Sequence, residues 1–384
     1  MRNIIFVTAK RMTDTMAQKK NIDSLQLLRA IAVSLVILLH AGSNGTTKFA
    51  AANPIGSFYH LETWGAIGVD LFFAISGFIM TIVMPAYLKP GGWKTFFVKR
   101  AVRILPLYYL LSALLVFTTV FVHHQALDIQ TVVKTLIFFP LFDSKTIVSP
   151  LMGVGWSLSY EIYFYTLIGM LLIFKKDLYR RMLLLIVVLS IAGLLIPTEI
   201  PLLKFLTSPI LLEFGFGIVC GLVYQKFNKL ELLPSQKKAI SVGLLLTGLV
   251  LMCATIFVRP DFDLHSITLV QNVNEKAFYR ALLWGLPSAI FMLGTILTMQ
   301  SFHKRTPAAC VLAGDASYSA YLIHTKVYLM FAYVFKYLSL GPVLYLIVIV
   351  PACLMVSIVF YRLVEKPLIK IFTRPKKAVA ILPG

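Results

Sequence analysis

Titratable residues lie inside strongly apolar segments of this sequence, at spacings suited to acid–base chemistry and phosphate binding. The first apolar segment carries Arg29 and His40, and a separation of 11 residues is about 16 Å, or three helical turns, along an α-helix. The two side chains therefore share one helix face at different depths. An arginine at the mouth can hold a phosphate while an imidazole deeper in acts as a base. An arginine that merely orients the helix, with an interfacial histidine, explains this segment equally well.

Two carboxylates in later apolar segments are candidate partners for such a base. Glu161 lies one or two turns into its predicted helix, where an ionised side chain costs about 2.5–3.5 kcal/mol on insertion scales. It therefore needs either an acid–base role opposite a histidine or a structural ion pair, for example with Lys326. Asp70, near the outer end of its own segment, can also orient a nearby histidine. Ser76 stands beside a glycine, and a close approach of two helices is the simpler interpretation of that pair.

A pair of arginines, Arg100 and Arg103, follows the second apolar segment. Their i, i+3 spacing puts both guanidinium groups on one side of a helix. Guanidinium groups bind phosphates through bidentate hydrogen bonds, which suits a nucleotide-bearing donor on the cytoplasmic side. Taken alone, the pair is explained more simply by the ordinary positive charge of a cytoplasmic loop.

A late segment places Ser317, Tyr321 and His324 on one helix face. It contains no Gly-x-Ser-x-Gly elbow, and no serine stands with a histidine and an aspartate in a triad pattern, so nucleophilic-serine catalysis has little support. The four cysteines fall inside apolar runs at unrelated spacing. That pattern favours buried thiols over a disulfide framework or a zinc site, and we expect no metal.

The elements that must position these side chains are transmembrane helices. Of the 384 residues, 59% are hydrophobic and only 14% are charged, whereas soluble domains carry about 25% charged residues. A bilayer core of about 30 Å is spanned by about 20 apolar residues. Runs of this kind cover roughly residues 25–44, 65–85, 104–122, 153–174, 181–197, 205–225, 239–258, 280–300, 309–335 and 343–363.

The net charge of +20 marks topology and not nucleic-acid binding. With the N-terminus placed in the cytoplasm, most of the 36 Lys and Arg residues fall in cytoplasmic segments, where short basic loops stay. They are spread over separate segments and form no single basic face for a nucleic acid. We predict an all-α polytopic membrane protein with about ten transmembrane helices in one bundle. Both termini would be cytoplasmic, and the chain would contact membrane lipids but no nucleic acid.

Five of these segments together resemble the acyltransferase-3 family of integral membrane acyltransferases, of the type that O-acetylates exopolysaccharide or O-antigen. The resemblance covers about residues 24–368. Each motif alone is weak, and it is their order along the chain that makes the set specific. The motifs are Arg29-x10-His40, Gly68-Val-Asp70-Leu-Phe-Phe-x-x-Ser76-Gly77-Phe78, Arg100-x-x-Arg103, Trp156-Ser157-Leu-Ser-Tyr-Glu161 and Ser317-Tyr318-Ser-x-Tyr321-Leu-x-His324.

This resemblance implies a multi-pass protein of the bacterial inner membrane that transfers an acyl group, expected to be acetyl. The donor would be cytoplasmic acyl-CoA, expected to be acetyl-CoA, and the acceptor a hydroxyl of an extracytoplasmic polysaccharide or lipid-linked glycan. It implies that His40 is catalytic, with Asp70 and Glu161 as its candidate partners. It further implies a set of arginines that bind acyl-CoA, namely Arg29, Arg100 and Arg103. Substrate contacts are expected from Ser76, Trp156, Ser157, Tyr163, Tyr321 and His324.

The predicted organisation is a cytoplasmic extension over residues 1–24, an acyltransferase transmembrane domain over 25–368 and a cytoplasmic tail over 369–384. The alternative function is a proton-coupled transporter of a polysaccharide precursor or small solute, with His40 and Glu161 as a proton relay. We find no internal repeat of the kind many transporters show, and the cytoplasmic arginine pair also favours the acyltransferase.

Overall fold

The structure of the chain is a computed structural model. It describes residues 23–49, 64–138, 141–142, 145–148, 150–174, 177–257, 264 and 266–373. Most of the predicted N-terminal extension, most of the predicted tail and most of the loop after the first span lie outside the described residues. The predicted domain bounds at the two ends of the chain therefore stay predictions.

Within the described residues, nine helical stretches are long and apolar enough to cross a membrane. This confirms an all-α polytopic membrane protein. Large apolar side chains remain exposed on them, such as Leu184 at 62% and Ile347 at 67%, as expected of surfaces that face lipid. The stretches are Asp23–Ser43, Ile67–Tyr87, Gly92–Val122, Gly155–Phe174, Leu178–Leu195, Pro201–Lys229, Pro234–Phe257, Asn274–Ser301 and Pro342–Thr373.

Of the ten predicted spans, the one over residues 309–335 is not among these nine stretches. It is divided at Ala316 into a short helix α14 (Ala308–Asp315) and a helix α15 (Ser317–Tyr337) of 21 residues. α15 is long enough to cross a membrane but carries His324, Lys326 and Lys336 among its apolar residues, which lowers its mean hydropathy. Its polar residues face the bundle interior in part: His324 is fully buried, as membrane-embedded polar groups usually are.

The long helices that build the site are α3 (Ile67–Val83), α4 (Gly92–Phe117), α6 (Gly155–Leu171) and α15, together with the first helix, residues 23–40. The remaining long helices are α7 (Leu178–Leu195), α9 (Leu211–Lys229), α10 (Pro234–Ala254), α13 (Leu286–Ser301) and α16 (Pro342–Phe360). Short helices complete the fold: α5 (Ile129–Leu136), α8 (Pro201–Leu206), α11 (Ile267–Asn272), α12 (Asn274–Arg280) and α17 (Lys366–Thr373).

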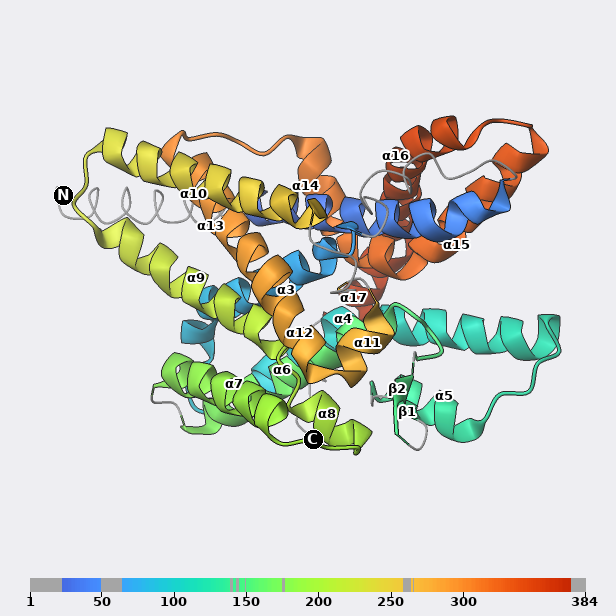
Figure 1. Ribbon diagram of the computed structural model, residues 1–384, viewed down its shortest axis with the longest axis horizontal. Helices are drawn as coiled ribbons and strands as arrows, with labels where there is room; N and C mark the ends of the chain where they lie inside the picture. Colours follow the sequence, from blue (N-terminus) through green and yellow to red (C-terminus); the bar gives the residue numbers. More distant parts are fainter. Residues whose placement is uncertain are drawn as a thin grey trace, which may run out of the picture.

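α3 lies at the centre of the helical arrangement, where it packs against α9 and α13 (Figure 1). α10 packs along α13, and α15 packs along α16. The strands β1 (Leu141–Phe142) and β2 (Ile147–Val148) form a short antiparallel pair, in which β1 contacts α5 and β2 contacts α8 and α11. α3 also contacts α6, one of the helices that build the site.

The contact between α3 and α9 is set by glycines on both helices. A Cβ added to Gly217 would lie 2.1 Å from the carbonyl oxygen of Ala74, and one added to Gly77 would lie 2.1 Å from that of Phe214. Small residues allow this backbone approach, which brings helices together where no hydrophobic effect from water is available. The Ser76-Gly77 pair, expected as a packing notch, takes part in it through Gly77.

We expect Gly217→Ala to destabilise the fold, because the new methyl group has no room unless α3 and α9 move apart. Overpacking of this kind costs about 1–3 kcal/mol. Gly243→Ala is the matched control, since a Cβ there meets no atom within 4 Å. The measurement is the temperature at which the detergent-solubilised protein loses its monodisperse size-exclusion peak. Equal temperatures for Gly217→Ala, Gly243→Ala and the unmodified chain would contradict the packing described.

Candidate active site

A cavity of about 330 Å³ opens among the first helix, α3, α4, α6 and α15. Four basic side chains line it, namely Arg29, Lys99, Arg100 and Arg103. These residues come from two segments that are far apart in the sequence. The structure thus brings together all three arginines that the sequence predicted to bind acyl-CoA.

The arginines of the cavity lack carboxylate partners among the described residues: none forms an ion pair within 4.0 Å there. Arg29 donates from Nε to the Ser317 hydroxyl at 3.1 Å. Arg100 lies over the rings of Phe96 and Tyr165, at 5.7 and 5.2 Å from their centroids. Its Nε is buried and has no hydrogen-bond partner in the described part of the chain. A buried donor without a partner is costly, so Arg100 Nε is a candidate hydrogen-bond donor to a ligand in the cavity.

Glu161 is the carboxylate on the cavity wall. Its Oε1 accepts a hydrogen bond from Ser76 at 2.9 Å and another from the Tyr165 hydroxyl at 2.5 Å. Ser76 and Tyr165 also line the cavity. Glu161 therefore faces the cavity and is held by two hydroxyls, without an ion pair to Lys326 or another cation within the described residues.

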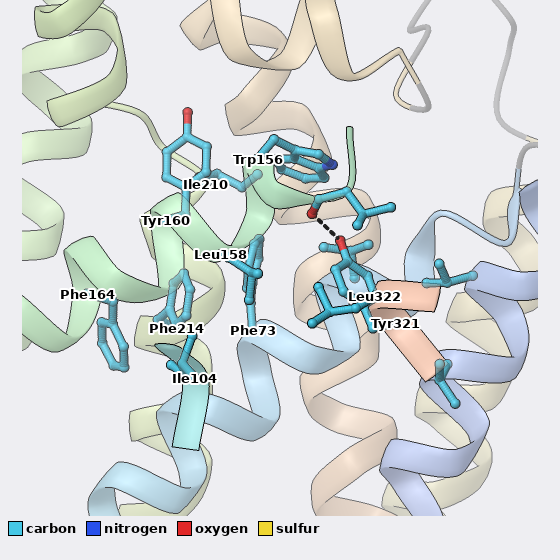
Figure 2. Close-up of a cluster of buried hydrophobic side chains, with 14 of the residues drawn as sticks. Phe73, Ile104, Trp156, Leu158, Tyr160, Phe164, Ile210, Phe214, Tyr321 and Leu322 are labelled. Atoms are coloured by element: carbon cyan, nitrogen blue, oxygen red, sulfur yellow. Dashed lines mark hydrogen bonds between the residues drawn. The ribbon is translucent and has the colours of Figure 1, made fainter. Parts of the chain in front are cut away.

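Tyr321 connects the cavity to α15. Its hydroxyl lies 2.7 Å from the Ser157 hydroxyl and donates to the carbonyl oxygen of Val154 at 3.0 Å, the hydrogen bond drawn in Figure 2. Both Tyr321 and Ser157 line the cavity. One turn further along α15, the ring of His324 lies 6.1 Å from that of Tyr321.

His40 and His324 form a pair beside this wall. His40 Nδ1 lies 2.9 Å from the carbonyl oxygen of Val36 and 3.2 Å from His324 Nε2. His324 Nδ1 lies 2.8 Å from the carbonyl oxygen of Tyr321. Carbonyl oxygens only accept, so we assign the Nδ1 proton in both rings. The one Nδ1 proton of His40 is then shared between the Val36 carbonyl and His324 Nε2. Nε2 of a neutral His40 in this tautomer carries a lone pair, as a general base requires.

His40 is half-buried. It does not line the cavity that contains Arg29, Arg100 and Arg103, called here the arginine cavity. The first helix changes to a π-helical turn (Ala41–Gly45) directly after it, and such turns are frequent at functional sites. The 11-residue spacing thus places Arg29 in the cavity and His40 outside it. His40 contacts His324, which lies one helical turn from the cavity residue Tyr321.

Asp70 does not contact either histidine. Its Oδ1 and Oδ2 accept from Arg280 Nε and Nη2 at 2.9 and 2.8 Å, and both side chains are fully buried. Arg280 also donates to the backbone carbonyls of Leu264 and Ala66, at 3.0 and 3.2 Å. The pair therefore fastens the start of α3 to α12 and to the loop before it.

Two further predicted residues lie outside the cavity lining. Trp156 packs edge-on against Phe73, with ring centroids 6.2 Å apart, and lies beside the Arg280 guanidinium. Tyr163 donates to the carbonyl oxygen of Leu206 at 3.0 Å. Neither is placed to contact a ligand in the cavity. The sequence did not single out Lys99 and Tyr165, which also line it. Lys99 stands four residues before Arg103 and Tyr165 four residues after Glu161, and this i, i+4 spacing on a helix was the available signal.

A family model described as an acyltransferase domain matches residues 22–362. The chain belongs to the acyltransferase-3 family. It is an acyltransferase of the membrane, and its five motifs meet in or beside one cavity. No solved structure matches it.

Two curated relatives have names that bear on chemistry. The exopolysaccharide production protein ExoZ of Rhizobium meliloti (strain 1021) is 26% identical over 341 residues, which cover 88% of this acyltransferase and 98% of ExoZ. The peptidoglycan O-acetyltransferase OatA of Listeria monocytogenes is 27% identical over 340 residues, which cover 81% of this chain and 50% of OatA. The chain is thus similar to nearly all of ExoZ and to half of OatA.

We expect Arg280→Met to destabilise this acyltransferase by about 3–5 kcal/mol, because it leaves the Asp70 carboxylate buried without its partner. Lys145→Met is the matched control. Lys145 pairs with Glu199 at 3.5 Å, but both side chains are more than 70% exposed, and exposed pairs contribute about 0–1 kcal/mol. Thermal unfolding of the purified variants in detergent measures the difference. Equal losses from the two substitutions would show that the Asp70–Arg280 pair does not hold α3.

Proposed function

We propose that this acyltransferase moves an acyl group, acetyl by preference, from cytoplasmic acyl-CoA to a hydroxyl of an extracytoplasmic glycan. The observation that supports this proposal most strongly is that Arg29, Arg100 and Arg103 line one cavity. Tyr321, on the wall of the same cavity, lies beside the His40–His324 pair. Cations without carboxylate partners suit the phosphates of the donor. A histidine pair beyond them suits proton removal from the acceptor.

The donor would enter from the side where α4 begins. Lys99, Arg100 and Arg103 lie in the first half of α4, in a segment that the distribution of basic residues assigns to the cytoplasm. Arg29 adds a fourth cation from the first helix. With the phosphates held there, the pantetheine arm follows the cavity past Glu161 and brings the thioester to Tyr321 and Ser157.

The transfer step would use His40 as the general base. His40 Nε2 removes the proton from the acceptor hydroxyl as its oxygen bonds to the thioester carbonyl carbon. The carbon–sulfur bond breaks, and the proton passes to the sulfur, so that the products are an ester and free CoA thiol. His324 holds the His40 ring by accepting from Nδ1, and this positioning favours the required tautomer.

The carboxylates take different parts in this scheme. Glu161 lies among the donor-binding residues, where its hydrogen bonds to Ser76 and Tyr165 fix the cavity wall. Asp70 acts through Arg280 by holding α3, to which Ser76 belongs. His40 therefore depends on His324 and on the Val36 carbonyl for its orientation, and not on a carboxylate.

The acceptor is proposed to be a surface polysaccharide or lipid-linked glycan, made at the bacterial inner membrane. The names of the relatives support this class, since one concerns exopolysaccharide production and the other peptidoglycan O-acetylation. Proton-coupled transport is the second candidate, because two histidines in contact inside a membrane bundle can also relay protons.

The test is the ester-linked acyl content of surface glycan, measured by NMR in a gene deletion strain complemented with variants. We expect the unmodified chain to restore an ester and His40→Ala to lose it by at least about 100-fold, the usual contribution of general base catalysis. His123→Ala, which alters an exposed histidine outside the cavity, should restore the ester fully. Membrane abundance is compared by immunoblot.

Unchanged glycan esters in the deletion strain would contradict the proposal, as would full ester content with His40→Ala. If the deletion instead causes a glycan precursor to accumulate in the cytoplasm, with esters intact, transport becomes the supported function.

A further inference from the structure

We infer that the aromatic end of the cavity selects short acyl groups, and that Phe72 sets the limit. This inference rests on the proposed function and names the part of the donor that occupies this end. It concerns five lining residues, called here the aromatic end: Val69, Phe72, Phe73, Leu158 and Tyr321.

The direction of the cavity follows from α3. Val69, Phe72 and Phe73 lie near the start of this helix, whereas Ile79 lies near its end. Phe72 and Ile79 are seven residues apart, so they share a helix face about 10 Å from one another. Tyr87, in the turn after α3, has the Lys99 ammonium 5.5 Å from its ring centroid. The cavity thus runs from a basic end to the aromatic end along α3.

The aromatic end is a fixed wall. Phe73 is 3% exposed and packs on Phe214, with ring centroids 4.5 Å apart. Tyr321 is held by its hydrogen bonds to Ser157 and Val154. Figure 2 shows the side chains of Phe73, Leu158 and Tyr321, from three different helices, gathered in one region. These contacts leave the wall little freedom to move outward around a larger group, because close-packed interiors resist expansion.

Phe72 differs from its neighbours because it is only half-buried. It lines the cavity, and its ring lies edge-on to Tyr321, with centroids 6.1 Å apart. Since Tyr321 adjoins the histidine pair, a thioester that reaches the reactive position has its acyl group against the Phe72 ring. The Phe72 ring therefore limits the length of the acyl chain that this end of the cavity can hold.

The volume of the cavity is small enough to favour a short acyl group on the donor. The whole cavity holds about 330 Å³, close to the lower bound of about 300 Å³ for small-molecule pockets. The arm of the donor must share this space with the acyl group. Because the aromatic side chains fill the far end, acetyl fits and a chain of several further methylene groups does not.

The experiment uses membrane vesicles from the expressing strain, which hold the endogenous acceptor, and supplies radiolabelled acetyl-, butyryl- or hexanoyl-CoA. Base-labile label on the glycan is counted for the unmodified chain, Phe72→Leu, Phe72→Ala and Ile79→Ala. Ile79→Ala is the matched control, since Ile79 lines the same cavity from the same helix face at the basic end. Phe72→Leu keeps the test valid if Phe72→Ala is poorly folded.

We expect the unmodified chain to prefer acetyl over hexanoyl by at least about 100-fold, because one methylene in a hydrophobic pocket is worth about 10-fold or more. Phe72→Ala should lower this ratio by at least about tenfold, Phe72→Leu should lower it less, and Ile79→Ala should leave it unchanged. Equal use of hexanoyl and acetyl by the unmodified chain would overturn the inference. So would a Phe72→Ala variant that slows all donors equally. Absence of glycan label from every donor would instead overturn the proposed function.

Discussion

A charge inside a membrane bundle needs a partner, and this constraint decides where the polar side chains of this acyltransferase stand. Asp70 and Arg280 pair through two hydrogen bonds between fully buried side chains, and Arg280 also donates to the carbonyl oxygens of Leu264 and Ala66. That pair is structural. Arg29, Arg100 and Arg103 have no such partner among the described residues, and they line a cavity. They share the cavity wall with Glu161 but form no ion pair with it, so their guanidinium groups stay available to a ligand that enters.

α15 couples the two halves of the site. Ser317 at its start accepts a hydrogen bond from Arg29, Tyr321 lines the cavity one turn later, and His324 contacts His40 in the turn after that. The first helix presents Arg29 and His40 in the same order. The first helix and α15 thus contact each other through polar side chains at two positions along their length.

The sequence could predict the class of the fold, because apolar runs of about 20 residues are typical of transmembrane helices. It grouped Arg29, Arg100 and Arg103, which line one cavity, but it placed Glu161 with His40, whereas Glu161 lines the cavity of the arginines. It could not predict the partner of Asp70. Arg280 lies 210 positions later in the chain, and nothing in its local sequence sets it apart from other basic residues of the loops. Nor could it predict the break at Ala316 or the exclusion of Tyr163 from the cavity, since tertiary packing decides both.

We propose transfer across the membrane from a donor bound in the cavity that Arg29, Arg100 and Arg103 line. Sealed vesicles of known orientation, with acyl-CoA supplied on one face only, test this directly. We expect ester on the glycan only when acyl-CoA is on the face that was cytoplasmic, with the acceptor on the other face. Ester formation from acyl-CoA confined to the outer face, at the same rate, would contradict it.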